Sequence, residues 1–114
     1  MTLLSLGSPD FRSIETANKS VIKTGQKTVA IASTAEQFPA QAIPTGYSVV
    51  IKGLDANTNK VHVAKSAADA QVDANAYELG AGQFLILKIT NLNLLWLNAN
   101  VNGQGVTFAV EVDA

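Results

Sequence analysis

The stretch that decides the fold is residues 77–97, Tyr-Glu-Leu-Gly-Ala-Gly-Gln-Phe-Leu-Ile-Leu-Lys-Ile-Thr-Asn-Leu-Asn-Leu-Leu-Trp-Leu. Its first aliphatic run, residues 84–87, leaves no polar face, which predicts a strand covered on both sides. A second apolar run follows at residues 94–97, after an Asn-Leu-Asn break at 91–93. Glycines before the first run and asparagines between the two would interrupt a long helix. We therefore expect two short strands at the centre of a β-sheet domain.

Alternation with a period of two extends the β prediction to the rest of the chain. Residues 106–112 alternate Val and Phe with Thr, Ala and Glu, which predicts a strand with one buried face. Residues 28–32 and 47–51 alternate in the same way, and the first of these two segments would place Val29 and Ile31 on one face. The strand signal thus runs through most of the chain after its first quarter.

Turn residues indicate how these strands connect. The loop 55–59, Asp-Ala-Asn-Thr-Asn, is expected to pair the strand before it with residues 61–63. Asn102-Gly103 is expected to form a second hairpin turn, because glycine adopts backbone angles that other residues resist. Two of the three prolines lie in residues 34–46, which predicts a crossing from one sheet to another.

The overall pattern predicts an all-β fold. Residues 66–76 are rich in alanine but have no apolar stripe, so we expect an exposed loop or a brief helical turn there. Six or seven strands without interleaved helices predict an antiparallel β-sandwich or a small jelly roll. We divide the chain into an N-terminal arm, residues 1–24, and a β-sandwich domain, residues 25–114.

The composition limits the partners. At 114 residues the chain is expected to form one ordinary domain. Charged residues make up 15% and the formal net charge is −1, so we expect neither nucleic acid nor an anionic membrane as a partner. The absence of cysteine excludes disulfides and thiolate metal sites and fits synthesis in a reducing cytoplasm. A surface so poor in charge favours a homo-oligomer, in which other chains cover part of it.

The candidate metal ligands are few. The single histidine, His62, lies between two valines, so its side chain is expected to face solvent and to have no ligand or catalytic role. Asp55, Asn57 and Asn59 match the opening of a calcium-binding loop. The glycine and the glutamate required later in such a loop are missing, which favours a plain hairpin loop.

Other candidate sites have structural interpretations. Asp69 and Asp73 are four residues apart and could pair on a helical turn, but solvated loop charges are the stronger interpretation. The glycine-rich residues 79–83 lead into a strand rather than a helix, which indicates a turn and not a phosphate site. Tyr47 and Trp96 could form a stacking platform, although the leucines around Trp96 favour core packing. We expect no catalytic residue, no cofactor and no metal.

The N-terminal arm contains the candidate partner-binding residues, which are Leu3, Leu4, Leu6 and Phe11. No basic residue precedes the leucines and no apolar run has secretory length, so a signal peptide is not expected. The four residues follow neither a helix nor a strand period. Their apolar character predicts burial, either on their own domain or on a neighbouring chain, and both alternatives remain open at this point.

Six motifs in the last two thirds of the chain suggest a family. They are Val-Val-Ile-Lys-Gly-Leu at 49–54, Asn-Thr-Asn at 57–59, Val-His-Val at 61–63, Tyr-Glu-Leu-Gly-Ala-Gly-Gln at 77–83, Asn-Leu-Asn-Leu-Leu-Trp-Leu at 91–97 and Gly-Val-Thr-Phe-Ala-Val-Glu at 105–111. This arrangement resembles the small β-sandwich structural proteins of tailed-bacteriophage virions, including capsid decoration and head-fibre proteins. Such proteins often have Pro-Gly-Glu where this chain has Ala81-Gly82-Gln83.

The resemblance implies a function without catalysis. It implies a structural protein that is made in the host cytoplasm, binds the major capsid protein on the outside of the virion and reinforces the shell, often as a homotrimer. A tail or fibre component that recognises a host glycan is the alternative. An enzyme is not expected, because no nucleophile, base and orienting residue can be assembled from the sequence.

Overall fold

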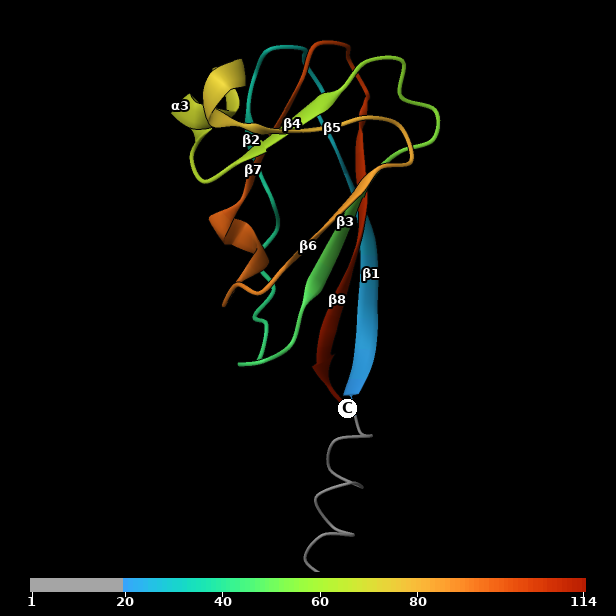
Figure 1. Cartoon of the computed structure of the whole chain (residues 1–114), viewed down its shortest axis with the longest axis vertical. Coiled ribbons are helices and arrows are strands. Elements are labelled where there is room, and N and C mark those ends of the chain that lie inside the picture. Colours follow the sequence, from blue (N-terminus) through green and yellow to red (C-terminus); the bar gives the residue numbers. More distant parts are fainter. Residues whose placement is uncertain (1–19) are drawn as a thin grey trace, which may run out of the picture.

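The computed structural model of the chain describes residues 20–114, which form two four-stranded antiparallel sheets (Figure 1). The first sheet contains, in spatial order, β1 (Ser20–Thr28), β8 (Gly105–Asp113), β3 (Val49–Gly53) and β6 (Phe84–Leu87). The second contains β2 (Glu36–Gln37), β7 (Trp96–Ala99), β4 (Val61–Ala64) and β5 (Tyr77–Leu79). Short helical turns form α3 (Ala67–Ala70), η1 (Asp73–Asn75) and η2 (Leu92–Leu94).

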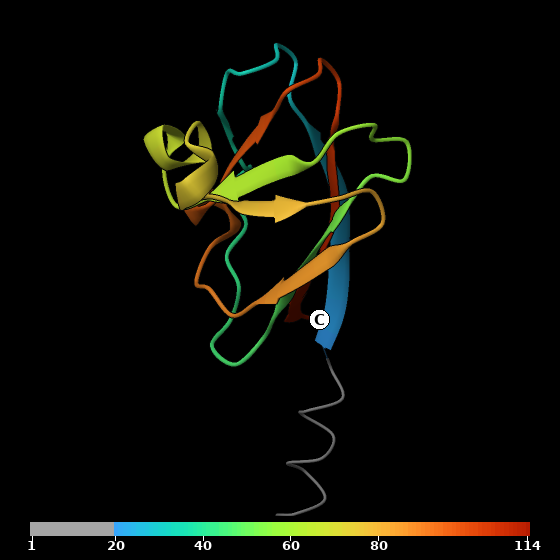
Figure 2. The same ribbon diagram turned by 45° about the horizontal axis from the view of Figure 1, so that its top comes forward.

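The order of the strands is that of a jelly roll. Every connection except the one from β4 to β5 carries the chain from one sheet to the other, which gives the paired orders β1-β8-β3-β6 and β2-β7-β4-β5. Eight antiparallel strands wound in this way make two Greek keys. The turned view in Figure 2 shows β4 and β5 of the second sheet running across the direction of the long β1–β8 ladder. The expected antiparallel sandwich is confirmed.

The core lies between the two sheets and is built from alternate residues of their strands. The two sheets contribute inward valines, leucines and isoleucine that are almost fully buried: Val49, Ile51, Val106 and Val110 from the first sheet, and Val61, Val63, Leu79 and Leu97 from the second. Burial of each such side chain contributes about 1.5–3 kcal/mol relative to exposure. The alternation predicted for residues 106–112 therefore corresponds to one face of β8 turned into this core.

Two predicted hairpins are wrong, although the turn at Asn102-Gly103 is present. Gly103 has φ +79°, as expected for a turn glycine, but it joins β7 of the second sheet to β8 of the first. The loop 55–59 likewise joins β3 to β4, which lie in different sheets. Both loops contain residues typical of turns, but the inward faces of the strands decide which sheet each strand joins.

Two predicted strands also need correction. The segment 28–32 turns away at the end of β1, so Val29 is fully buried while Ile31 is 65% exposed and Ser33 has φ +63°. The apolar run 84–87 is an edge strand instead of a central one, because β6 pairs only with β3 among the described strands. Residues 34–46 cross between the sheets as expected, with β2 formed on the way.

Candidate functional site

The outer face of the first sheet has an exposed apolar row. The strand register places Ile86 of β6 opposite Val50 of β3, and Val50 opposite Ala109 of β8, so the three residues cross the sheet side by side. Ile86 is 57% exposed, and Phe84, two residues earlier on the same face of β6, is 61% exposed. Large apolar side chains gathered on one face of a sheet indicate a surface that another molecule covers.

The sequence of β6 explains why this face is apolar. Leu85 and Leu87 pack against the core, so the alternate residues Phe84 and Ile86 must face outward. A run without a polar face can result from burial on both sides or from one buried side and one side that binds a partner. The sequence predicted burial of residues 84–87 on both sides. In the structure of residues 20–114, the side that carries Phe84 and Ile86 is exposed. We call Ile86, Val50, Ala109 and Phe84 the outer apolar face.

The turn between β5 and β6 borders this face. Gly82 has φ +75°, and the backbone N–H of Gly80 donates to Gln83 Oε1 at 2.7 Å, which closes the turn as the sequence predicted. A shallow hollow lies beside it, between the exposed rings of Tyr77 and Phe84. The edge strands β5 and β6 therefore lie next to each other at this turn, and each carries an exposed aromatic side chain, Tyr77 on β5 and Phe84 on β6.

His62 is placed differently from the prediction, because its side chain is buried. The ring lies on the outer face of β4, where α3 and η1 cover the second sheet, and the residue is only 2% exposed. Its cross-strand neighbours are Glu78 on β5 and Asn98 on β7. The expectation of a solvent-facing histidine failed because the alanine-rich segment 66–76 packs on the sheet.

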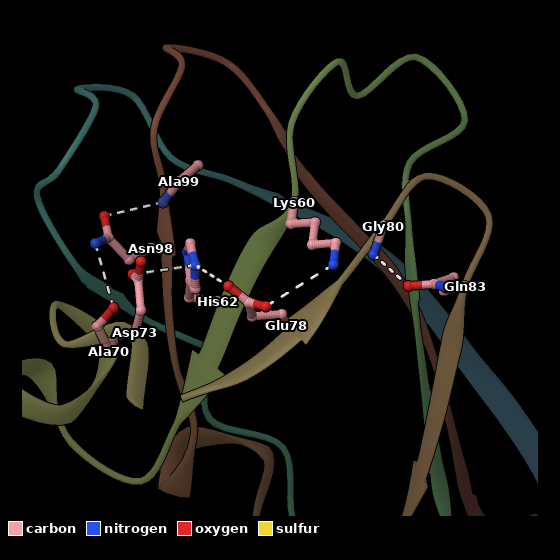
Figure 3. Close-up of polar contacts among 9 residues, drawn as sticks. All are labelled: Lys60, His62, Ala70, Asp73, Glu78, Gly80, Gln83, Asn98 and Ala99. Carbon is pink, nitrogen blue, oxygen red and sulfur yellow. Dashed lines mark hydrogen bonds and ion pairs between the residues drawn. The ribbon is translucent and has the colours of Figure 1, made fainter. Parts of the chain in front are cut away.

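The covering segment is held by specific polar contacts. Ser66 caps α3, its hydroxyl accepting from the backbone N–H of Asp69 at 3.2 Å. The Asn98 amide donates to the backbone carbonyl of Ala70 at 3.3 Å, which ties the end of α3 to β7 (Figure 3). These contacts place η1, and with it Asp73, beside the imidazole.

His62, Asp73 and Glu78 converge at one point. His62 Nε2 lies 3.2 Å from Glu78 Oε2 and 3.3 Å from Asp73 Oδ1, as Figure 3 shows. All three ligand atoms lie within 4.8 Å of one another. Within residues 20–114 they are the group that could hold a metal ion. Asp69, which the sequence spacing allowed as a partner of Asp73, instead accepts from the Asn75 amide at 3.3 Å.

The loop 55–59 has a structural role. Asn57 donates to the carbonyl of Gly105 at 2.8 Å and accepts from its N–H at 3.2 Å, which fastens the loop to the start of β8. The backbone N–H of Asn59 donates to Gln104 Oε1 at 3.3 Å. Because the side-chain amide of Asn57 is hydrogen-bonded to the backbone of Gly105, the loop does not present alternate oxygens to a calcium ion.

The remaining predicted residues do not form a site together. Tyr47 is half-buried and its hydroxyl donates to Asp113 Oδ1 at 3.0 Å, while Trp96 is half-buried on β7, opposite Gln37 of β2. The carboxylate raises the pKa of the Tyr47 hydroxyl, because the hydrogen bond holds its proton. The arm residues lie outside the described residues; they are Leu3, Leu4, Leu6 and Phe11.

Comparison with protein-family models, with curated proteins and with solved structures gives no match. No helix within residues 20–114 is long and apolar enough to cross a membrane. The topology therefore defines the class, a jelly-roll β-sandwich, and many unrelated functions use that fold. Function has to be argued from the outer apolar face and from the cluster around His62.

Proposed function

We propose that this protein is a non-enzymatic structural protein of a bacteriophage virion that binds the outside of the capsid as a decoration, or cement, protein. Copies of the chain associate through the outer apolar face into a trimer. The N-terminal segment, with Leu3, Leu4, Leu6 and Phe11, binds the major capsid protein. The host cytoplasm is the site of synthesis and the capsid surface the final location.

The observation that carries this proposal is the outer apolar face. Phe84 and Ile86 each expose more than half of their surface, and Ile22 on the same sheet is 63% exposed; the register places Lys52 opposite Phe84 and Glu111 opposite Ile22. A net charge of −1 leaves little repulsion between copies, so three copies of this face can pack together around a threefold axis.

The direction in which the chain leaves the sandwich also supports the proposal. Ser20 begins β1 opposite Asp113 at one end of the first sheet. The nineteen residues before Ser20 contain the apolar arm residues and join the sandwich at β1, the edge strand of the sheet that carries the outer apolar face. Contacts of the sheet and contacts of the arm can then form on adjoining surfaces of one assembly.

The test compares two exposed isoleucines that lie on different parts of the molecule. Ile86→Asp places a charge on the outer apolar face, whereas Ile31→Asp places the same charge on the turn after β1, where the side chain is equally exposed. We expect Ile86→Asp to reduce the mass measured by analytical ultracentrifugation and to abolish co-sedimentation with empty shells of the encoding phage. Ile31→Asp should behave as the wild type. The proposal would be overturned if the wild-type protein sedimented as a monomer and did not co-sediment with shells.

The alternative, a tail or fibre component that recognises a host glycan, is favoured by one observation. Tyr77 is exposed between the hollow at Phe84 and a second hollow lined by Lys65, Asp69 and Asn75. An aromatic ring flanked by amide and charged groups suits stacking on a sugar. Screening the protein and its Tyr77→Ala variant on an array of bacterial surface glycans separates the two proposals. Binding that depends on Tyr77, without shell binding, would favour the glycan.

A further inference from the structure

The cluster of His62, Asp73 and Glu78 brings together side chains from three separate elements. His62 belongs to β4, Glu78 to the neighbouring edge strand β5 and Asp73 to η1, which lies over the sheet (Figure 3). The imidazole is rigidly placed because it is buried, whereas the Asp73 and Glu78 side chains are 77% and 42% exposed. The buried ring therefore presents one nitrogen to two carboxylates that remain open to solvent.

In this arrangement two carboxylates face one imidazole nitrogen, and a further positive charge would balance them. Nε2 of a neutral imidazole can donate one proton, yet it faces two carboxylate oxygens at 3.2 and 3.3 Å. The one lysine near the cluster, Lys60, lies 3.9 Å from Glu78 Oε1, the oxygen that points away from the imidazole. Two carboxylates that share one donor repel each other, and a cation between them would relieve that repulsion.

The distances point to a particular class of cation. Four ligands placed tetrahedrally at 2.0–2.1 Å from zinc are separated from one another by about 3.3 Å. The two N···O separations around Nε2 match that spacing. We propose that His62, Asp73 and Glu78 bind a divalent transition-metal ion of the zinc class, with water in the fourth position.

The donor set argues against the hard cations. Calcium and magnesium prefer six or more oxygen ligands, whereas this site offers one imidazole nitrogen and two carboxylates. Imidazole with carboxylate suits zinc and its first-row neighbours. The loop 55–59 contrasts with this site, because the side-chain oxygen of Asn57 already accepts from the backbone N–H of Gly105.

The other ring nitrogen sets the expected strength of binding. His62 Nδ1 is buried and has no hydrogen-bond partner among the described residues. Metal-bound histidines usually donate from this nitrogen to an acceptor, and loss of that contact costs roughly 10–100-fold in affinity. We therefore expect a weaker site than a structural zinc site with complete outer contacts.

A bound ion would act as a clamp. It would join η1 to β4 and to the edge strand β5, and so fix the segment that covers the second sheet. This role does not depend on the proposed virion function. It predicts that the covering segment exchanges its amide hydrogens more slowly when the metal is present.

The experiment uses the full chain without an affinity tag, stripped of metal, and titrates it with Zn²⁺. Because the sequence has one histidine, the ¹⁵N resonances of its ring report on the site without ambiguity. We expect one ion per chain, a large shift of the Nε2 resonance and a proton on Nδ1. Asp73→Asn and Glu78→Gln keep the side-chain shapes and should each weaken binding about tenfold or more. Asp55→Asn, on a distant exposed loop, is the matched control and should change nothing.

Two results would overturn the proposal. One is the absence of any Nε2 shift at millimolar Zn²⁺. The other is binding that persists unchanged in both Asp73→Asn and Glu78→Gln. Because these two side chains are largely exposed, the variants are expected to fold even if a substitution at buried His62 is not tolerated.

Discussion

The ring of Phe108 lies over Gly25, its partner across the β1–β8 ladder. A Cβ atom built on Gly25 would come within 2.6 Å of Phe108 Cζ, which is closer than two carbon atoms can approach. The same ring packs edge-on against Phe38, with the centroids 6.3 Å apart and the planes at 65°. Because Gly25 has no side chain, the Phe108 ring can lie over it and also contact Phe38, which follows β2.

Gly25→Ala should therefore be destabilising. The added methyl group forces the Phe108 ring out of its place, and overpacking of this kind costs about 1–3 kcal/mol. Combining Gly25→Ala with Phe108→Leu removes the ring that is in the way, so the two changes should be less costly together than their sum. Urea unfolding of the wild type, both single variants and the double variant measures this coupling. Additivity of the two effects would show that the ring can move aside freely.

Truncation of Leu97 should destabilise the chain far more than truncation of Ile86. Leu97 is fully buried in β7, so Leu97→Ala should lower the free energy of unfolding by about 2–5 kcal/mol. Ile86 faces solvent in a single chain, and Ile86→Ala should cost the monomer only about 0.5 kcal/mol or less. Denaturant melts at a concentration where the chain is monomeric make the comparison. Equal losses at both positions would mean that the outer apolar face is covered within one chain.

Glu36 should contribute to stability at neutral pH but not in acid. Lys27 Nζ donates to Glu36 Oε1 at 2.7 Å and the backbone N–H of Ala30 donates to Oε2 at 2.7 Å. These hydrogen bonds, that of Lys27 first, lower the pKa of Glu36 below its ordinary value of 4.5. A lowered folded-state pKa adds stability above the ordinary pKa, and this stability is lost as the pH falls through the lowered value.

Glu36→Gln is the corresponding variant. It should be less stable than the wild type at neutral pH, and the difference should shrink in acid well below pH 4.5. Urea melts across this pH range measure the effect, with Asp55→Asn as a control whose carboxylate is 81% exposed and has only Lys52 near it, at 3.6 Å. A difference that stays constant with pH would refute the assigned hydrogen bonds.

The effect of an N-terminal truncation on stability should depend on whether the cut lies before or within β1. Removal of residues 1–19 leaves β1 whole, so the β spectrum and most of the melting temperature should persist while shell binding is lost. Removal of residues 1–24 deletes five of the nine residues of β1 and takes away the β1 partners of residues 109–113 of β8. We expect that shorter protein to melt earlier and to aggregate. Circular dichroism and light scattering distinguish the two outcomes, and identical behaviour would contradict the observed start of β1 at Ser20.

The sequence predicted the class of fold because alternation depends on local spacing. Residues 106–112 alternate as the buried and open faces of β8 require. Pairing between strands was not predictable in the same way. The turns at 55–59 and at Asn102-Gly103 permit a hairpin, but whether one forms depends on which sheet each inward face completes.

The cluster around His62 could not be predicted from spacing alone. Its three residues are separated by a covering segment whose alanines carry no apolar stripe, and small side chains are what allow that segment to lie close to β4. Ser66, which caps α3, was the available signal that residues 66–76 are ordered. The outer apolar face was visible as an apolar run, but the run does not say which of its sides is open.

The adjacency of Ser20 and Asp113 bears on how the protein can be used to display cargo. A domain fused after Ala114 would emerge beside the start of β1, where residue 19 joins the sandwich, and would crowd the contact that we propose for the N-terminal segment. The loop 55–59 follows the other end of β3, where Gly53 lies opposite Val106, far along the ladder from Asp113. An insertion between Asp55 and Ala56 would point the cargo away from Ser20 and Asp113, and joining residue 113 to residue 20 through a short linker would give a circularly permuted chain with new ends in that loop.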